Sequence, residues 1–161
     1  MTYILNAALP QNELLFSIKL ESSIQKLVPR LMDFESHSLM LPCQLKNMKI
    51  LSKTEEGIKT EEILVFKTLV KNEIKQTSIH KKISDNNINS KILSGPASGT
   101  NIDIELMESE GKTNVNIKVK LKLSLKALFL FPIIKKVYKN LLTGILFKIE
   151  NSILSKEEND V

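Results

Sequence analysis

The feature that most constrains the fold is a run from Val115 to Leu123 in which apolar and polar residues alternate strictly. A period of two is typical of a β-strand with one buried face and one solvated face. An apolar pattern with helical spacing follows almost at once, from about Lys126 to Ser155. A strand that leads directly into a long terminal helix predicts a sheet whose buried face packs against that helix.

The terminal segment is predicted to form one long helix with an apolar stripe on one side. Pro132 is expected to kink or restart this helix, and residues 156–160 are expected to form a frayed, solvated tail. The two uncharged runs, 127–134 and 140–147, are separated by lysines and fall short of the ~20 residues that a membrane span needs. The segment is therefore predicted to be a buried helix or one that lies at a membrane surface. The predicted stripe comprises Ile134, Tyr138, Leu141, Leu142, Ile145, Ile149 and Ile153.

The rest of the chain has the pattern of an antiparallel sheet with two short helices inserted after its first strand. That strand is predicted at 14–21 and the helices within 23–41, because Pro29 should end or kink a longer helix after about one turn. From Gln44 onward, apolar runs separated by short connections rich in Gly and Asn favour hairpins. We therefore predict an α+β fold with a curved antiparallel sheet of about seven strands, two short helices and a long C-terminal helix. The later strands are predicted near 44–53, 58–69, 73–84, 88–94, 101–109 and 113–124.

The composition is that of an ordinary globular domain, with 42% hydrophobic and 25% charged residues among 161. We expect one domain over residues 1–161, with a core of about 12–155. The net charge of +5 comes from lysines spread over every segment, and only 5% of residues are aromatic, which argues against nucleic-acid binding but is compatible with weak attraction to anionic lipid. Cys43, the only cysteine, excludes an intrachain disulfide, and no basic segment precedes the first apolar stretch as a signal peptide requires. A cytoplasmic protein is expected.

The predicted order of elements resembles the helix-grip fold of the START/Bet v 1-like (SRPBCC) superfamily over about 12–155. The segment from Asp33 to Cys43 resembles the coenzyme Q-binding and polyketide cyclase branch, in which acidic residues follow the first helix and a Leu-Pro element precedes the second strand. Gly99 and Thr100 resemble the Gly-Thr pair that opens a late strand in these families. The resemblance implies a hydrophobic pocket between sheet and terminal helix, which different members use to carry lipids or quinones or to bind or cyclise polyketides.

Three positions are candidates for a functional site, and each has a structural alternative. His80 shares a strand face with Ser78 and Gln76, which fits a polar group inside a cavity or, more commonly, an exposed strand. The hydroxyl of Tyr138, on the apolar stripe, requires a partner, which is either a backbone carbonyl or a ligand oxygen. Gly144, in mid-helix, is expected to mark the close approach of a strand or a ligand.

The other polar candidates are expected to be structural. Asp33 and Glu35 are two residues apart and do not face each other on a helix, so they are expected to cap a helix or stabilise a turn rather than to form an acid/base pair. His37 is expected in a surface loop, with a gate at a pocket mouth as the alternative, and Cys43 is expected to be a small buried residue. Cys43, His37 and His80 lack the spacing of metal ligands, so neither a metal nor another cofactor is predicted.

The leading interpretation is a protein that binds or transports a hydrophobic small molecule, such as a lipid, an isoprenoid quinone or a polyketide-like compound, rather than an enzyme. One alternative is a cyclase or dehydratase with His80 or Tyr138 as its acid or base, and another is a protein-interaction module of the same fold. The apolar segment 129–132, followed by Lys135 and Lys136, is expected to touch a membrane surface transiently during ligand transfer. The predicted ligand-binding residues are Phe34 and Leu41 at the pocket mouth, with His80, Ile104, Val119, Leu121, Tyr138, Leu141 and Ile145.

Overall fold

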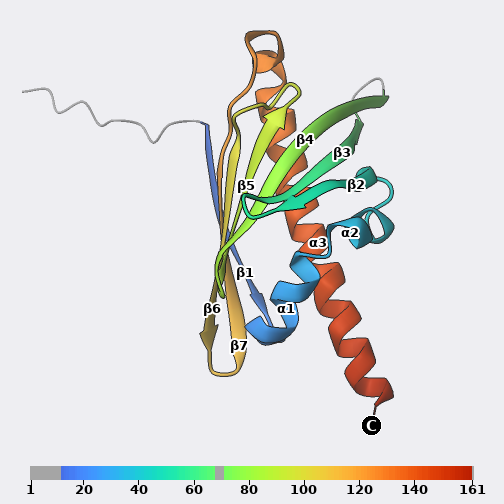
Figure 1. Cartoon of the computed structure of the whole chain (residues 1–161), viewed down its shortest axis with the longest axis vertical. Helices are drawn as coiled ribbons and strands as arrows, with labels where there is room; N and C mark the ends of the chain where they lie inside the picture. Colours follow the sequence, from blue (N-terminus) through green and yellow to red (C-terminus); the bar gives the residue numbers. More distant parts are fainter. Residues whose placement is uncertain (1–11, 68–70, 161) are drawn as a thin grey trace, which may run out of the picture.

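The computed structural model describes residues 12–67 and 71–160, which form one antiparallel sheet with three α-helices (Figure 1). Its elements are β1 (Glu13–Leu20), α1 (Ile24–Leu31), α2 (Phe34–Met40), β2 (Leu45–Thr54), β3 (Gly57–Lys67), β4 (Lys71–Ser84), β5 (Asn87–Ser94), β6 (Asn101–Ser109), β7 (Lys112–Lys120), the 3₁₀ helix η1 (Leu125–Leu130) and α3 (Phe131–Asn159). The strand order is β1-β7-β6-β5-β4-β3-β2. This architecture confirms the predicted α+β helix-grip fold with seven strands.

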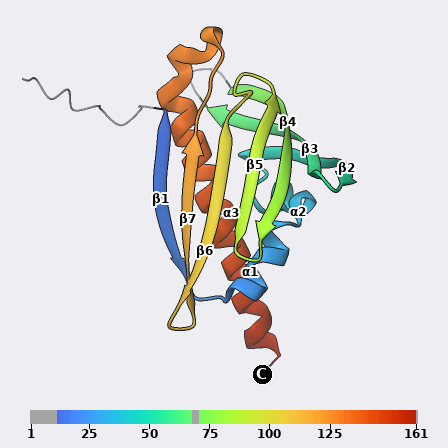
Figure 2. The same cartoon turned by 60° about the vertical axis from the view of Figure 1, so that its left-hand side comes forward.

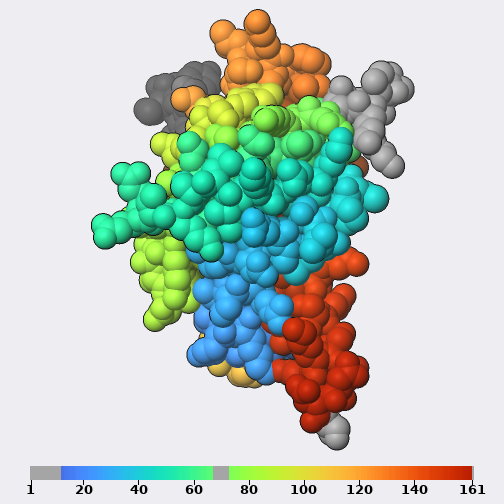
Figure 3. All heavy atoms as spheres, turned by 45° about the vertical axis from the view of Figure 1, so that its right-hand side comes forward, coloured from blue at the N-terminus to red at the C-terminus, as the bar shows by residue number. Residues whose placement is uncertain are grey.

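The sheet curves around α3, which lies along its concave face (Figures 1 and 2). Each strand from β2 to β6 pairs with the next one along the chain, whereas β1 pairs with β7. Because β1 and β2 are at opposite edges of the sheet, α1 and α2 carry the chain from one edge to the other. Figure 3 shows α1, α2 and β2 together on one face of the molecule, with α3 beside them.

The alternating run forms β7 from Val115 up to Lys120, and its apolar side chains face the core as predicted. Val115, Ile117 and Val119 are 0%, 2% and 0% exposed, respectively. Lys118, on the opposite face of β7, is half-buried. Burying each such apolar side chain contributes roughly 1.5–3 kcal/mol before conformational entropy is subtracted. The sheet therefore has one apolar face, and this face packs against α3.

The first helix differs from its prediction. α1 continues through Pro29 to Leu31, although a proline inside a helix removes one backbone hydrogen bond. The buried side chains of Leu27, Val28 and Leu31 hold the last turn against the core, which explains why the helix does not end at Pro29. Tertiary packing here outweighs the local effect of proline.

The terminal helix begins and ends later than predicted, at Phe131 and Asn159. Pro132 lies in its first turn, directly after η1, so the predicted restart of the helix at this proline is confirmed. The predicted frayed tail is wrong, because α3 runs to Asn159 and Glu157 forms an ion pair with Lys26 of α1. The preceding strand ends at Lys120 rather than at residue 124. Among the helices of the described ranges, none is both long and apolar enough to cross a bilayer.

Candidate functional site

A cavity of about 90 Å³ lies between the concave face of the sheet and helices α2 and α3. Most of its wall is apolar, with Phe34 from α2, Ile104 from β6, and Leu141 and Ile145 from α3. One water molecule needs roughly 10–15 Å³ of such volume, whereas pockets for drug-sized ligands begin near ~300 Å³. The cavity therefore has room for several waters or a small group, and a lipid-sized molecule must displace side chains to enter it.

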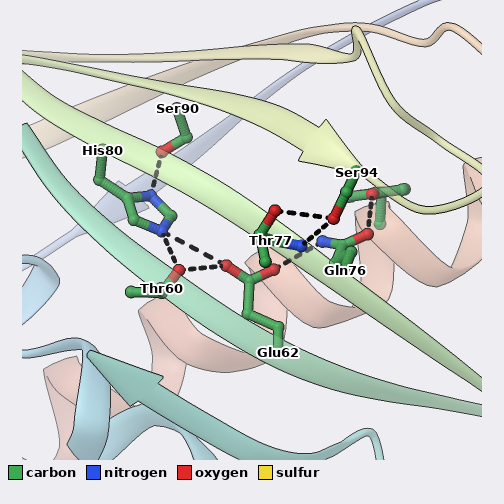
Figure 4. Close-up of polar contacts among 8 residues, drawn as sticks. Thr60, Glu62, Gln76, Thr77, His80, Ser90 and Ser94 are labelled. Carbon is green, nitrogen blue, oxygen red and sulfur yellow. Dashed lines mark hydrogen bonds and ion pairs between the residues drawn. The ribbon is translucent and has the colours of Figure 1, made fainter. Parts of the chain in front are cut away.

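Buried polar side chains gather at one part of this cavity wall, and Figure 4 shows Glu62, Gln76, His80 and Ser90 among them. They are supplied by β3, β4, β5 and α3, and each is 7% exposed or less. Burial at this level is costly for polar groups unless they are hydrogen-bonded. We call this set, together with Thr60, which bonds to Glu62 but does not line the cavity, the polar cluster; its other members are Glu62, Gln76, His80, Ser90 and Tyr138.

Strand register brings the polar cluster together. Side chains two residues apart on a strand share a face, so Thr60 and Glu62 point to the same side of β3. In the β3–β4 pair, Glu62 lies opposite Gln76 and Thr60 lies opposite Ser78. His80, two residues beyond Ser78, lies opposite Ser90 in the β4–β5 pair. Three adjacent strands thus direct polar side chains toward the cavity.

Glu62 is the centre of the hydrogen-bond network. Its Oε1 accepts from the hydroxyl of Thr60 at 2.7 Å, and its Oε2 accepts from Nε2 of Gln76 at 2.6 Å. Oε1 of Gln76 accepts in turn from the hydroxyl of Tyr138 at 3.0 Å. This last bond joins α3 to the sheet, and it gives the Tyr138 hydroxyl a side-chain partner instead of the backbone carbonyl or ligand oxygen that the sequence suggested.

His80 completes the polar cluster. Its Nε2 lies 2.8 Å from Oγ1 of Thr60 and 3.3 Å from Oε1 of Glu62, and its Nδ1 lies 2.7 Å from Oγ of Ser90. Because Thr60 gives its single proton to Glu62, Nε2 of His80 is the donor to Thr60. Phe34 stacks on the imidazole, with 4.0 Å between ring centroids. The interpretation of His80 as an exposed strand residue is wrong, since it is 6% exposed.

The polar cluster holds a buried negative charge and a neutral phenol. Burial raises the pKa of Glu62, but hydrogen bonding and charge interaction with His80, followed by the bonds from Gln76 and Thr60, outweigh it and keep the pKa below its ordinary value of 4.5. Burial, and then the charge of Glu62, raise the pKa of Tyr138 above its ordinary value of 10.0. At neutral pH, Glu62 is therefore ionised and Tyr138 is a hydrogen-bond donor.

His37 lines the same cavity from α2, so its expected place in a surface loop is wrong. The residue is 4% exposed, its Nε2 lies 3.2 Å from the carbonyl oxygen of Arg30, and its ring meets Phe34 edge-on at 5.5 Å. Desolvation lowers the pKa of His37 below its ordinary value of 6.5, against smaller opposing effects of the Arg30 carbonyl and Asp33. The imidazole is therefore held in its neutral form.

Acidification is expected to destabilise the protein partly through His37. Unfolded His37 takes up a proton near pH 6.5, whereas the folded residue, with its lowered pKa, takes one up only at lower pH. Within that interval the unfolded state binds more protons, so the free energy of unfolding falls as the pH falls. Urea unfolding between about pH 7 and 5 should show a steeper loss for the unmodified protein than for His37→Gln. Parallel pH profiles for the two proteins would contradict this assignment.

The structure brings six of the nine predicted ligand-binding residues to the cavity wall. Leu41, Val119 and Leu121 do not line it: Leu41 is half-buried, and Val119 and Leu121 are buried in the core. A Cβ placed on Gly144 would come within 2.9 Å of a methyl carbon of Leu41, so this glycine marks the close approach of a side chain rather than of a strand or a ligand. The six residues at the wall are Phe34, His80, Ile104, Tyr138, Leu141 and Ile145.

Sequence reasoning missed Thr60, Glu62 and Ser90. A signal existed for the first two, because Thr60 and Glu62 share a strand face with the apolar Leu64, which is 2% exposed. Cys43 was expected to be buried and is exposed. Within residues 12–67 and 71–160, no three His, Cys, Asp or Glu side chains converge as metal ligands would.

The fold is shared with several solved structures of very different sequence. The protein TTHA0849 from Thermus thermophilus has a TM-score of 0.75 at 10% identity, over 89% of this chain and 98% of that one. A START superfamily protein from Mycobacterium smegmatis has a TM-score of 0.70 at 13% identity, over 89% and 97% of the two chains. The Zhui aromatase/cyclase from Streptomyces sp. R1128 has a TM-score of 0.69 at 8% identity, over 87% and 92%.

No family model matches the sequence. No curated protein matches it either. The structural likeness shows that the chain has the START/Bet v 1-like helix-grip fold, which it shares with aromatase/cyclases.

Proposed function

We propose that this protein binds a small hydrophobic molecule in the cavity between the sheet and α3. The observation that carries the proposal is an apolar cavity whose wall includes a polar cluster built from four elements. A cavity and a set of buried polar groups each lower the stability of a core. Their occurrence at the same place is best explained by the binding of a ligand there. The occurrence of the same fold in a START superfamily protein and in an aromatase/cyclase supports this role.

The size of the cavity restricts how such a molecule is held. About 90 Å³ suits a single ring or a short branched chain better than a whole quinone, polyketide or lipid. A larger ligand would insert one end and widen the site by moving α3 side chains such as Leu142, which lines the cavity and is half-buried. Predicted residues that line the wall, such as Phe34 and Ile145, would make the apolar contacts with the ligand.

Native mass spectrometry of freshly purified protein, followed by solvent extraction, tests this proposal. We expect a co-purifying hydrophobic molecule, and we expect Ile104→Phe to abolish it because the larger side chain occupies the cavity. Ile83→Phe is the matched control, since Ile83 is 57% exposed on β4 and the same substitution there leaves the cavity unchanged. Circular dichroism would verify that both variants fold. Unmodified protein that is always empty, and that shows no uptake of added hydrophobic probes, would contradict the proposal.

An enzyme of the cyclase or dehydratase type is the second candidate, and the polar cluster favours it. A buried carboxylate within 3.3 Å of an imidazole, linked through Gln76 to a tyrosine hydroxyl, can accept and return a proton beside an apolar substrate. Incubation of the extracted molecule with fresh protein distinguishes the two roles. A carrier returns the molecule unchanged, whereas an enzyme changes its mass or retention, and Glu62→Gln should abolish that change.

We further propose transient contact between η1 and an anionic membrane surface. Leu125 and Phe129 are 88% and 77% exposed, and Lys126 between them is also exposed. In Figure 3 the orange segment that contains η1 projects at one end of the molecule. Exposed apolar side chains next to lysine suit the boundary between acyl chains and anionic head groups. The same exposed patch is what the interpretation as a protein-interaction module would predict.

Vesicle flotation tests the membrane proposal. The protein should float with vesicles that contain phosphatidylserine and much less with pure phosphatidylcholine vesicles. The double variant Leu125→Ser, Phe129→Ser should lose roughly tenfold in binding, because two exposed apolar anchors are removed. Leu39→Ser is the matched control, since Leu39 is 83% exposed on α2 and lies outside η1. Equal flotation of all three proteins would contradict a role for η1.

A further inference from the structure

Ser78 presents an unpaired hydroxyl to the cavity. The residue lies on β4, is 0% exposed and lines the cavity wall. Within the described part of the chain, its Oγ has no hydrogen-bond partner. Buried polar atoms almost always have one, and an exception in a native structure requires an explanation. An orphan hydroxyl in the wall of a cavity indicates a place where a polar atom of a ligand binds.

The surrounding side chains explain why Ser78 is left without a partner. Ser78 lies opposite Thr60 on β3 and between Gln76 and His80 on the same face of β4. The hydroxyl of Thr60 donates to Glu62 and accepts from His80, while Gln76 donates to Glu62 and accepts from Tyr138. These neighbours therefore bond to one another and direct no group at Ser78. The polar cluster acts as a rigid frame around one free hydroxyl.

The charge of the cavity wall limits what that polar atom can be. Glu62 is buried in the same wall and is ionised at neutral pH. The described residues of the wall include neither lysine nor arginine. A carboxylate or phosphate would bring a second negative charge into an apolar space whose described wall has no lysine or arginine to balance it. A neutral hydroxyl or carbonyl oxygen meets no such repulsion.

We infer that the ligand is a neutral molecule with an apolar body and one oxygen substituent, a phenol, alcohol or ketone, whose oxygen hydrogen-bonds to Ser78. The cavity therefore selects against fatty acids and other anionic lipids. The inference rests on the proposed function and specifies the chemical class of its ligand. Phe34 and Tyr138 provide aromatic surface in the wall, which suits a ring as the apolar body.

Three probes of similar size test the inference: phenol, toluene and benzoate. Their dissociation constants would be measured by amide chemical-shift titration of the full chain. We expect phenol to bind about fivefold to tenfold more tightly than toluene, the effect of one buried hydrogen bond. Benzoate should not bind at concentrations that saturate the protein with phenol.

Ser78→Ala should remove the preference for phenol and leave the affinity for toluene unchanged. This variant should fold normally, because the hydroxyl that it removes has no partner in the described structure. Ser94→Ala is the control. The hydroxyl of Ser94, on β5, bonds to Thr77 in an exposed pair outside the cavity, so its removal should not affect binding. Ile104→Phe should abolish binding of both neutral probes, which places them in the cavity.

The possible results separate this inference from the proposed function. Equal binding of phenol and toluene, both abolished by Ile104→Phe, would overturn the role of Ser78 and leave the proposed function standing. Benzoate that binds as tightly as phenol would overturn the requirement for a neutral ligand. If none of the probes binds and the purified protein carries no co-purifying molecule, both the inference and the proposed function fail.

Discussion

Replacing His80 with alanine should lower the free energy of unfolding by about 3–5 kcal/mol, because it leaves the buried carboxylate of Glu62 without the imidazole beside it. Glu62 would keep its bonds to Thr60 and Gln76 but lose the imidazole at 3.3 Å, and Ser90 would lose its partner as well. Phe34 would also lose the ring on which it stacks. Urea denaturation followed by circular dichroism measures the change.

A double variant identifies the cause of the loss. If most of it arises from an uncompensated carboxylate, then His80→Ala with Glu62→Gln should be more stable than His80→Ala alone. Lys82→Ala, on the same strand but outside the polar cluster, should change stability by less than about 1 kcal/mol because its ion pair with Asp85 is exposed. If the stability losses of His80→Ala and Glu62→Gln simply add in the double variant, the proposed coupling between the two side chains is contradicted.

Glu150→Ala should lower the free energy of unfolding by about 3 kcal/mol, since it leaves two backbone N–H groups without a charged acceptor. Glu150 is 5% exposed on α3, and its Oε1 accepts from the amides of Glu21 and Ser22 at 2.5 and 3.2 Å. These amides lie where β1 turns into α1, far from α3 in sequence. The carboxylate thus links the turn between β1 and α1 to the C-terminal helix α3.

Two variants serve as controls for Glu150. Glu150→Gln retains an acceptor oxygen and should lose about half as much stability as the alanine variant. Glu157→Ala, one side of an exposed pair with Lys26 on the same helix as Glu150, should cost less than about 1 kcal/mol. A Glu150→Ala variant as stable as Glu157→Ala would show that water replaces the carboxylate.

The fold was predictable because its main elements have strong one-dimensional patterns. The alternation of apolar and polar residues in β7 and the apolar stripe of α3 each indicate, from the sequence alone, which face of the element is buried. Where local composition competes with packing, the prediction was less accurate. The last residues of α3 are charged and suggested a frayed end, yet the helix continues to Asn159 and Glu157 pairs with Lys26 of α1.

The polar cluster was predictable only in part, since burial of a polar strand face depends on its partner strand. Gln76, Ser78 and His80 alternate as residues on a solvated face would, and nothing within β4 distinguishes the two cases. The distinction comes from the register with β3, which places Glu62 and Thr60 beside them. Register depends on long-range pairing, so sequence periodicity identified His80 as a candidate without showing its partners.

Tyr138 has a consequence for the lifetime of a bound molecule. It lines the cavity, and its hydroxyl bonds to Gln76 across the gap between α3 and the sheet. A ligand that pushes α3 away from the sheet must break this bond on its way in, and a departing ligand meets the same barrier. For the ligand binding proposed above, breaking this one hydrogen bond would slow both entry and release by up to about tenfold.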